Sequence, residues 1–284
     1  MGTQELDREK IHSAVRDTYG EVARKRDVGG EAATACCEPA CCTPAANPTG
    51  PAVADSGQTL KKIAEAHRAI SDYSAEELAS VPPGAYLGEG SGTPVRHAGL
   101  QPGETVVDLG AGAGMDSFLA ANRVGPSGRV FGFDLTPDML QRARENAAQA
   151  GCANVTFQQA DIEHLPMASG AADAAISNCV INLTPDKPAV YREIYRVLKP
   201  GGRLSVSDIV LCGAPEAVRA FRAQSGPDAW CACVSGALRE EDYLAAIRAA
   251  GFADVREVSE RTAQSQPGNG VSGAAITVTA KKPQ

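Results

Sequence analysis

Apolar side chains recur at every third or fourth position near the start of the chain, over residues 7–25, with charged side chains between them. This spacing places the apolar positions on one face and predicts an amphipathic helix. The positions are Ile11, Val15, Tyr19 and Val22. Residues 27–57 are rich in Gly, Ala, Pro, Thr and Ser and offer no apolar face, so we expect a flexible arm there. A short helix is predicted over 59–70.

Short apolar runs alternate with amphipathic stretches from residue 104 onward, after a capping-box pattern at Ser74 that predicts a helix start. Strands alternating with helices predict a parallel sheet covered on both faces, which binds ligands at the carboxyl ends of its strands. The predicted strands span 104–109, 129–133, 155–159, 172–177 and 203–209, and the predicted helices span 115–123, 137–150 and 188–197. A helix over 240–250 and strands around Val255 and over 275–280 close the chain.

This pattern divides the chain into three parts. We expect an N-terminal helix with its arm over 1–72, an α/β domain over 73–209, and a smaller C-terminal α+β domain over 210–284. A length of 284 residues is sufficient for one sizeable core with such appendages.

The charge pattern narrows the class of partner. Acidic residues outnumber basic ones, 34 to 27, and the longest basic run is Arg24-Lys25-Arg26. Long-range attraction to nucleic acids or anionic membranes is therefore not expected. Residues 1–26 lack the apolar core of a secretory signal, and no run of eighteen apolar residues occurs. We expect a cytoplasmic protein that works as a monomer.

Nine cysteines are the unusual feature of the composition. Their number is odd, and four of them form two vicinal pairs, Cys36-Cys37 and Cys41-Cys42. Without a secretory signal this pattern fits a disulfide framework poorly. Reduced thiols that bind a soft ion or carry out redox chemistry fit it better.

A glycine loop directly follows the first predicted strand of the α/β domain. Val106-Val-Asp-Leu-Gly-Ala-Gly-Ala-Gly114 places glycines at alternate positions between a strand and a helix, where the backbone can approach a ligand closely. The pattern fits the G-x-G-x-x-G of dinucleotide sites less well. It resembles motif I of the class I methyltransferases that use S-adenosylmethionine (SAM), which implies a Rossmann-like methyltransferase domain.

Three further landmarks extend this resemblance: Asp134 at the end of the next strand, Gln159-Ala-Asp-Ile162, and Arg196-Val-Leu-Lys-Pro-Gly-Gly-Arg203. The family places an acid such as Asp134 at the ribose hydroxyls, and an acid and an apolar residue beside the adenine. Asp108 is expected to order the loop or to meet the amino end of the methionine moiety. The implied cofactor residues are Asp108, Gly110, Gly112, Gly114, Asp134, Leu135, Asp161, Ile162 and Asn178.

Two cysteine-containing phrases point to the methyl acceptor. Ser177-Asn-Cys-Val-Ile-Asn-Leu183 follows the fourth strand, and Trp230-Cys-Ala-Cys-Val-Ser-Gly-Ala237 lies beyond the fifth. Together with Asp186-Lys187 they resemble the arsenite methyltransferases. In that family the matching cysteines hold trivalent arsenic, which implies Cys179 and Cys233 as arsenic ligands here and arsenic detoxification as the role.

The chemistry is consistent with this resemblance. Trivalent arsenic is soft and thiophilic, so thiolates select it over harder ions. Its lone pair attacks the sulfonium methyl of SAM directly, so no proton has to be removed from the acceptor, and catalysis rests on holding the reactants close together. We expect a thiol reductant, glutathione or thioredoxin, as co-substrate.

One position departs from the family. The loop before the first strand has Ser91 where the family commonly has a cysteine within G-C-G, so a third thiol is missing and multiple methylation is in doubt. Two hypotheses follow. Two thiols suffice for a trivalent organoarsenical such as methylarsenite, or Cys231 or a thiol of the arm replaces the missing ligand.

The remaining cysteines have weaker cases. Cys152 is expected to be structural or exposed, and Cys212 to be a small core residue. The four paired cysteines of the arm are compatible with arsenic capture, redox exchange, another metal, or no role.

Two alternative functions stay open. One is a SAM-dependent small-molecule C- or O-methyltransferase in which Cys179 only lines the pocket. The other is a non-catalytic thiol-rich protein that binds arsenic on a degenerate cofactor fold.

Overall fold

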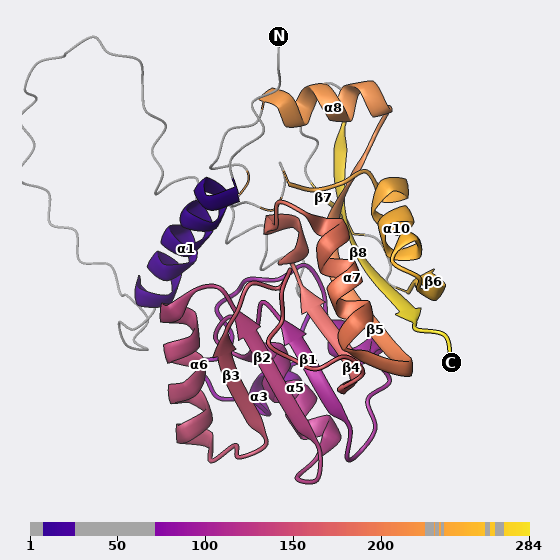
Figure 1. Cartoon of the computed structure of the whole chain (residues 1–284). Coiled ribbons are helices and arrows are strands. Elements are labelled where there is room, and N and C mark those ends of the chain that lie inside the picture. The colour runs from indigo at the N-terminus through magenta and orange to yellow at the C-terminus, as the bar shows by residue number, and fades with distance from the viewer. Residues whose placement is uncertain are drawn as a thin grey trace, which may run out of the picture.

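The computed structural model describes residues 8–25, 72–224, 230, 233, 236–258, 262–264 and 270–284. One central sheet organises them, with strand order β3-β2-β1-β4-β5-β8-β6 and β7 paired with β8 (Figure 1). The strands are β1 (Thr105–Leu109), β2 (Arg129–Asp134), β3 (Val155–Gln159), β4 (Ala172–Asn178), β5 (Leu198–Cys212), β6 (Ala253–Glu257), β7 (Thr262–Gln264) and β8 (Ser272–Lys281).

Strands β1 to β5 run parallel, and β8 runs antiparallel to β5, β6 and β7. Because β2 and β4 flank β1 on opposite sides, the strand order reverses beside β1. The connections leaving β1 and β4 diverge at this point, and a crevice opens at the carboxyl ends of the strands.

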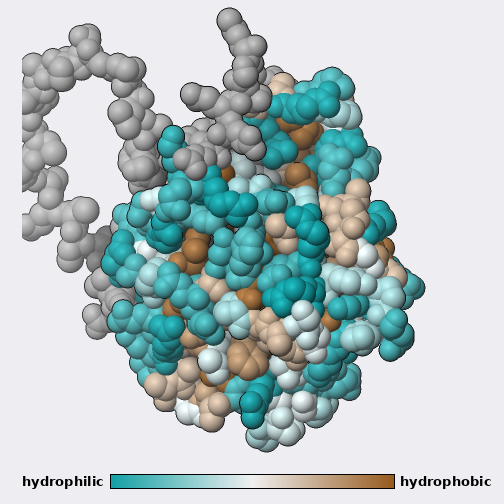
Figure 2. Space-filling model, viewed as in Figure 1, coloured by the Kyte–Doolittle hydropathy of each residue, from teal (hydrophilic) through white to brown (hydrophobic). Residues whose placement is uncertain are grey.

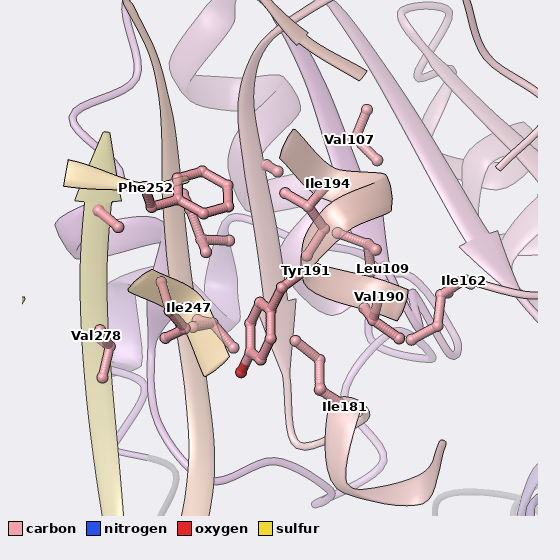
Figure 3. Packing of buried hydrophobic residues seen from close by; sticks show 14 of the residues in the cluster. Val107, Leu109, Ile162, Ile181, Val190, Tyr191, Ile194, Ile247, Phe252 and Val278 are labelled. Carbon is pink, nitrogen blue, oxygen red and sulfur yellow. The ribbon is translucent and has the colours of Figure 1, made fainter. Parts of the chain in front are cut away.

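Helices cover both faces of the sheet. They are α1 (Arg8–Lys25), α3 (Ala75–Ala79), α4 (Pro94–His97), α5 (Met115–Val124), α6 (Pro137–Ala150), the 3₁₀ turn η1 (Ile181–Leu183), α7 (Lys187–Val197), α8 (Pro215–Gln224) and α10 (Glu240–Ala249). Alternate residues of β1 serve the two faces, since Val107 packs with α7 and α10 whereas Val106 packs with α5 and α6. Figure 3 shows Tyr191 and Ile194 of α7 in the first of these cores, near Ile247 of α10.

The alternation of strands and helices predicted from the sequence is confirmed, with boundaries shifted by a few residues at most ends and further for β5, which begins at Leu198. The expected capping box is also present, because Ser74 and Glu77 exchange hydrogen bonds with each other's backbone. The expected arm at 27–57 and helix at 59–70 lie outside the described residues.

The C-terminal part differs from the expectation of a separate α+β domain. Strands β6, β7 and β8 do not form a sheet of their own but extend the central sheet, and β8 pairs with β5 over ten residue positions. The domain boundaries at 72/73 and 209/210 remain predictions.

Helix α1 lies beyond the carboxyl ends of the parallel strands and packs against α6 (Figure 1). An ion pair between Arg24 and Asp138, 2.6 Å long, fastens its C-terminal end to α6. The face of the molecule in Figure 2 is mostly hydrophilic, with apolar residues in separate small groups. No helix in the described part of the chain is long and apolar enough to cross a membrane.

Candidate functional site

A deep pocket opens at the carboxyl ends of β1, β2 and β4, where the strand order reverses. Its walls come from the glycine loop, from the ends of β2 and β4, from the segment after β3, and from α1. The expected cofactor residues that line it are Asp108, Gly110, Gly112, Asp134, Leu135, Asp161, Ile162 and Asn178. The sequence-derived set therefore converges on one cavity, with one exception described next.

The glycine loop between β1 and α5 forms the floor of the pocket. Gly112 has a left-handed φ of 52°, and a Cβ placed there would meet nothing within 4 Å, so the loop leaves open space for a ligand. Gly114 is the exception. It precedes α5 and does not line the pocket, and a Cβ there would collide with the rings of Phe118 and Phe157. We conclude that Gly114 permits close helix packing.

Asp134 is fixed by the backbone around it. One carboxylate oxygen accepts a hydrogen bond from the Gly112 N–H at 2.9 Å, and the other accepts one from the Thr136 N–H at 2.8 Å. Burial raises the pKa of Asp134, and these hydrogen bonds oppose that shift. The carboxylate therefore both orders the glycine loop and faces the pocket.

Asp161 and Ile162 line the adjacent wall just after β3, where α1 meets the pocket. Asp161 accepts a hydrogen bond from the Glu163 N–H, and its other oxygen lies 4.0 Å from His12 Nε2. Arg8 forms an ion pair with Glu163, whose side chain is fully buried. Nothing in the periodicity of α1 indicated that its apolar face would cover this pocket.

Two further carboxyls lie deep in the pocket. Asp108 accepts a hydrogen bond from Ser117 Oγ at 2.6 Å, and burial together with the nearby Asp116 raises its pKa to about 8. Burial likewise raises the pKa of Asp116 to about 6. One oxygen of Asp116 accepts hydrogen bonds from Tyr73 and Asn178, and the other has no partner among the described residues. An unpartnered buried acceptor of this kind suits a cationic ligand.

Asn178 connects this carboxyl to the loop that contains Ser91. Its Oδ1 accepts a hydrogen bond from the Ser91 N–H at 2.8 Å, and its Nδ2 donates to the Gly92 carbonyl at 2.9 Å. Ser91 is buried but does not line the pocket, and its hydroxyl finds no partner among the described residues. The serine thus lies one hydrogen bond away from the residue that precedes Cys179.

Cys179 and Cys233 come together beside the pocket, although 54 residues separate them in sequence. The Cys233 thiol donates to the Cys179 carbonyl at 3.1 Å, both side chains are buried, and neither is in a disulfide. Both residues have a φ of 60°, which is uncommon for residues other than glycine. A hydrogen bond with the side chain of Cys179, followed by burial, raises the pKa of the Cys233 thiol well above its usual range.

The segment around Cys233 is held in place by close contacts with η1. The indole N–H of Trp230 donates to the Leu183 carbonyl at 3.0 Å. A Cβ at Gly236 would lie only 2.0 Å from the Asn182 carbonyl oxygen, so only glycine permits this approach. Two distant segments are thereby locked against each other.

The sequence analysis assigned no site role to two buried polar groups near the thiols, Lys187 and Asp208. Lys187 donates to the Thr184 carbonyl at 2.9 Å and lies 5.2 Å from the Trp230 ring, and burial lowers its pKa to about 8. Asp208 is fully buried in β5, where the Tyr243 hydroxyl donates to it at 3.3 Å. Burial, followed by the proximity of Cys179, raises its pKa. The sequence signal that could have revealed Asp208 is a single acidic residue within an otherwise uncharged strand segment.

The other cysteines lie apart from this pair. Cys152 donates to Asn154 Oδ1 at 3.3 Å near the end of α6, as expected for a structural thiol. Cys212 ends β5, is half-buried and contacts Glu240. Cys231 and the four cysteines of the arm lie outside the described residues.

Comparison with known proteins agrees with this geometry. The sequence profile of a family described as "Methyltransferase domain" matches residues 100–251. The chain is similar to an arsenite methyltransferase of Halobacterium salinarum, with 48% identity over 181 residues that make up 63% of this chain and 45% of the relative. An arsenite methyltransferase of Aquipseudomonas alcaligenes is 39% identical over 169 residues, 57% of this chain and 48% of the relative.

Among solved structures, the chain is similar to CrArsM, an arsenic (III) S-adenosylmethionine methyltransferase from Chlamydomonas reinhardtii, with 32% identity and a TM-score of 0.58 over 78% of this chain and 73% of that one. YcgJ from Bacillus subtilis, 19% identical with a TM-score of 0.55 over 67% of this chain and 96% of that one, shares the fold. The fold is the Rossmann-like class I methyltransferase fold. The chain spans about half the length of the curated relatives it matches.

Proposed function

Because the chain belongs to the family of arsenite S-adenosylmethionine methyltransferases, we propose that it transfers a methyl group from SAM to trivalent arsenic held by Cys179 and Cys233. The observation that carries the proposal is the meeting of these two buried thiols beside the pocket, where Cys233 Sγ lies 3.1 Å from the Cys179 carbonyl oxygen. Two thiols at one point form a soft donor set. Such a set binds trivalent arsenic well, whereas a substrate methylated on carbon or oxygen has no need of it.

The residues of the pocket fit SAM. The open space above Gly112 admits a ligand against the backbone, and the unpartnered oxygen of Asp116 supplies an acceptor for a cation. Asp134 is oriented to bind hydroxyl groups, and Asp161 with Ile162 provides a polar and an apolar surface for a base. SAM, when bound, supplies an electrophilic methyl group on a sulfonium sulfur.

The chain's own residues position the acceptor. Cys179 and Cys233 bind arsenic as thiolates, and each gives up its proton as the bond to arsenic forms. Because the arsenic lone pair is the nucleophile, no side chain has to act as base in the transfer, and catalysis depends on proximity and orientation. A cellular thiol, glutathione or thioredoxin, keeps the two cysteines reduced.

Ser91 determines how many thiols are available to bind the arsenical substrate. A serine hydroxyl is a poorer arsenic ligand than a thiol, so the described part of the chain offers two thiols at this site. Two thiols complete the coordination of a trivalent organoarsenical such as methylarsenite, and they leave one position on arsenite for a non-protein ligand. Both arsenicals are therefore proposed substrates.

The test is a product analysis by mass spectrometry. The protein is incubated with SAM, glutathione and arsenite or methylarsenite, and methylated arsenic is measured. Cys179→Ser and Cys233→Ser are expected to abolish product, while Cys152→Ser, a matched change remote from the site, is expected to leave it unchanged. Absence of methylated arsenic with the unaltered protein, or full activity of both site variants, would overturn the proposal.

A further inference from the structure

We propose that Tyr19 of α1 is a specificity-determining residue of the arsenic site: its hydroxyl binds the one hydroxyl that arsenite retains between two thiols, and so favours arsenite over methylarsenite. The inference rests on the proposed function and goes further, because it assigns a discriminating contact to a helix that precedes the methyltransferase domain.

Tyr19 reaches the thiol pair from a distant part of the chain. Its hydroxyl oxygen lies 4.0 Å from Cys233 Sγ, across 214 positions of sequence. The side chain lines the same pocket as Cys179 and packs against the apolar cluster that holds both cysteines. A polar group of α1 thus lies beside the sulfur atom of Cys233.

The helix holds this hydroxyl in a defined place. Arg8 pairs with Glu163 near the N-terminal end of α1, and Arg24 pairs with Asp138 at 2.6 Å near the C-terminal end. Between them, Ile11 and Val15 are buried on the same face as Tyr19. Contacts on both sides of Tyr19 restrict its movement, as a specificity contact requires.

Arsenic binding is a ligand exchange that leaves a different group exposed for each substrate. When two thiols bind arsenite, two S–As bonds form and two As–OH bonds break, and each thiol proton leaves with a hydroxyl group as water. One As–OH remains. Methylarsenite undergoes the same two exchanges, and its third group is a methyl, which cannot form a hydrogen bond.

The chemistry of Tyr19 suits the remaining hydroxyl group. Tyr19 presents a phenol O–H group, which lies 4.0 Å from Cys233 Sγ and lines the pocket. A phenol can donate one hydrogen bond and accept another, and it therefore matches an As–OH group in either direction. A methyl group placed there forms no hydrogen bond with the phenol, so methylarsenite does not gain this contact.

The sole tryptophan of the chain provides a binding readout that does not depend on turnover. Trp230 lies in the cluster that contains both cysteines, so ligation of arsenic is expected to change its fluorescence. The experiment titrates the full chain and Tyr19→Phe with arsenite and with methylarsenite, using a phosphine reductant that adds no competing thiol.

We expect Tyr19→Phe to weaken arsenite binding by about five- to tenfold, the effect of one hydrogen bond, and to leave methylarsenite binding within about twofold. The ratio of kcat/KM for the two substrates should shift in the same direction. An equal loss for both arsenicals, or no loss for either, would overturn the proposal.

Two control variants separate specificity from folding. Arg24→Ala removes an ion pair of the same helix without touching the pocket, and it should affect both arsenicals equally. Tyr195→Phe removes a phenol hydroxyl from a residue that packs against Phe252, remote from the pocket, and it should affect neither. If the unaltered chain binds neither arsenical, the proposed function is wrong. If the unaltered chain binds both arsenicals and Tyr19→Phe binds each with the same affinity, only the proposed role of Tyr19 is wrong.

Discussion

The two halves of the pocket are built in different ways. The cofactor half is centred on one continuous strand, loop and helix, from Thr105 to Val124, with further walls at the ends of the neighbouring strands β2, β3 and β4. The thiol half is assembled from three segments that lie far apart in the chain: helix α1, η1 and the segment around Cys233.

This difference predicts which kind of substitution should disrupt each half. Backbone geometry and buried carboxyls define the cofactor half, so it depends on main-chain conformation and on charge. Side chains brought together over long sequence distances define the thiol half, so single side-chain changes should remove it and leave the fold intact. If the two halves are independent, each can be lost while the other still binds its ligand.

The largest effect is expected from Cys233→Ala. Loss of one of two thiols should lower arsenic methylation by about 100-fold or more, because arsenic is no longer held at the methyl-transfer distance. SAM binding, measured by calorimetry, should stay within about twofold, because the glycine loop is unaffected. A parallel loss of SAM affinity would contradict the independence of the two halves. Cys212→Ser is the matched control, since that thiol ends β5 outside the pocket.

Gly112→Ala is the reciprocal change. A Cβ there enters the open space above the loop and occupies a left-handed backbone position, so SAM affinity should fall by about tenfold. The change in Trp230 fluorescence on arsenite binding should be retained. Gly151→Ala serves as control, because Gly151 also has a left-handed backbone and open space around it but lies outside this pocket. Equal losses of SAM affinity in both variants would mean that backbone strain, and not the filling of the space above the glycine loop, causes the effect.

Asp116→Asn should change the stability of the ligand-free protein and its affinity for SAM in opposite directions. The pKa of this buried carboxyl is raised from 3.8 to about 6, so the folded state holds the proton more tightly than the unfolded chain does. Its contribution to stability is therefore complete below pH 3.8, decreases as the pH rises, and is lost above pH 6. At pH 7.5 the unaltered protein carries a buried charge, and the variant does not.

We therefore expect ligand-free Asp116→Asn to have a higher Tm than the unaltered protein at pH 7.5 and a similar Tm at pH 4. Its SAM affinity should fall several-fold, about fivefold, because the carboxylate no longer faces a cation. Differential scanning fluorimetry with and without SAM measures both effects. A stability difference that is the same at the two pH values would argue against titration of this group.

The smallest effect is expected from Arg24→Ala. The ion pair with Asp138 is largely exposed, and pairs of this kind contribute less than about 1 kcal/mol. Because α1 covers both halves, KM for SAM and for arsenite should rise together, by about twofold, and the increase should be smaller at high salt. An effect on only one of the two substrates would indicate that α1 belongs to a single half.

The comparison of predicted and observed features follows the same division. Gly110, Gly112 and Asp134, which the sequence motifs single out, line one pocket, because local sequence sets a strand–loop–helix turn. Their role in cofactor binding stays a prediction. Gly114 was assigned to the cofactor site but packs against Phe118 and Phe157 instead. Sequence periodicity also predicted α1, yet nothing in it indicated that His12 and Tyr19 would line the pocket.

Taken alone, the sequence determined the order of strands and helices and the glycine loop with its acids, and its resemblance to a family implied the pairing of Cys179 with Cys233. These features are local, since each depends on neighbouring residues or on a short motif. Only the tertiary structure decided that the C-terminal strands complete the central sheet, that the segment around Cys233 packs against η1, and that Tyr19 lies beside Cys233. Such contacts join residues far apart in the chain, and they form because burying apolar surface in one shared core fixes which distant segments meet.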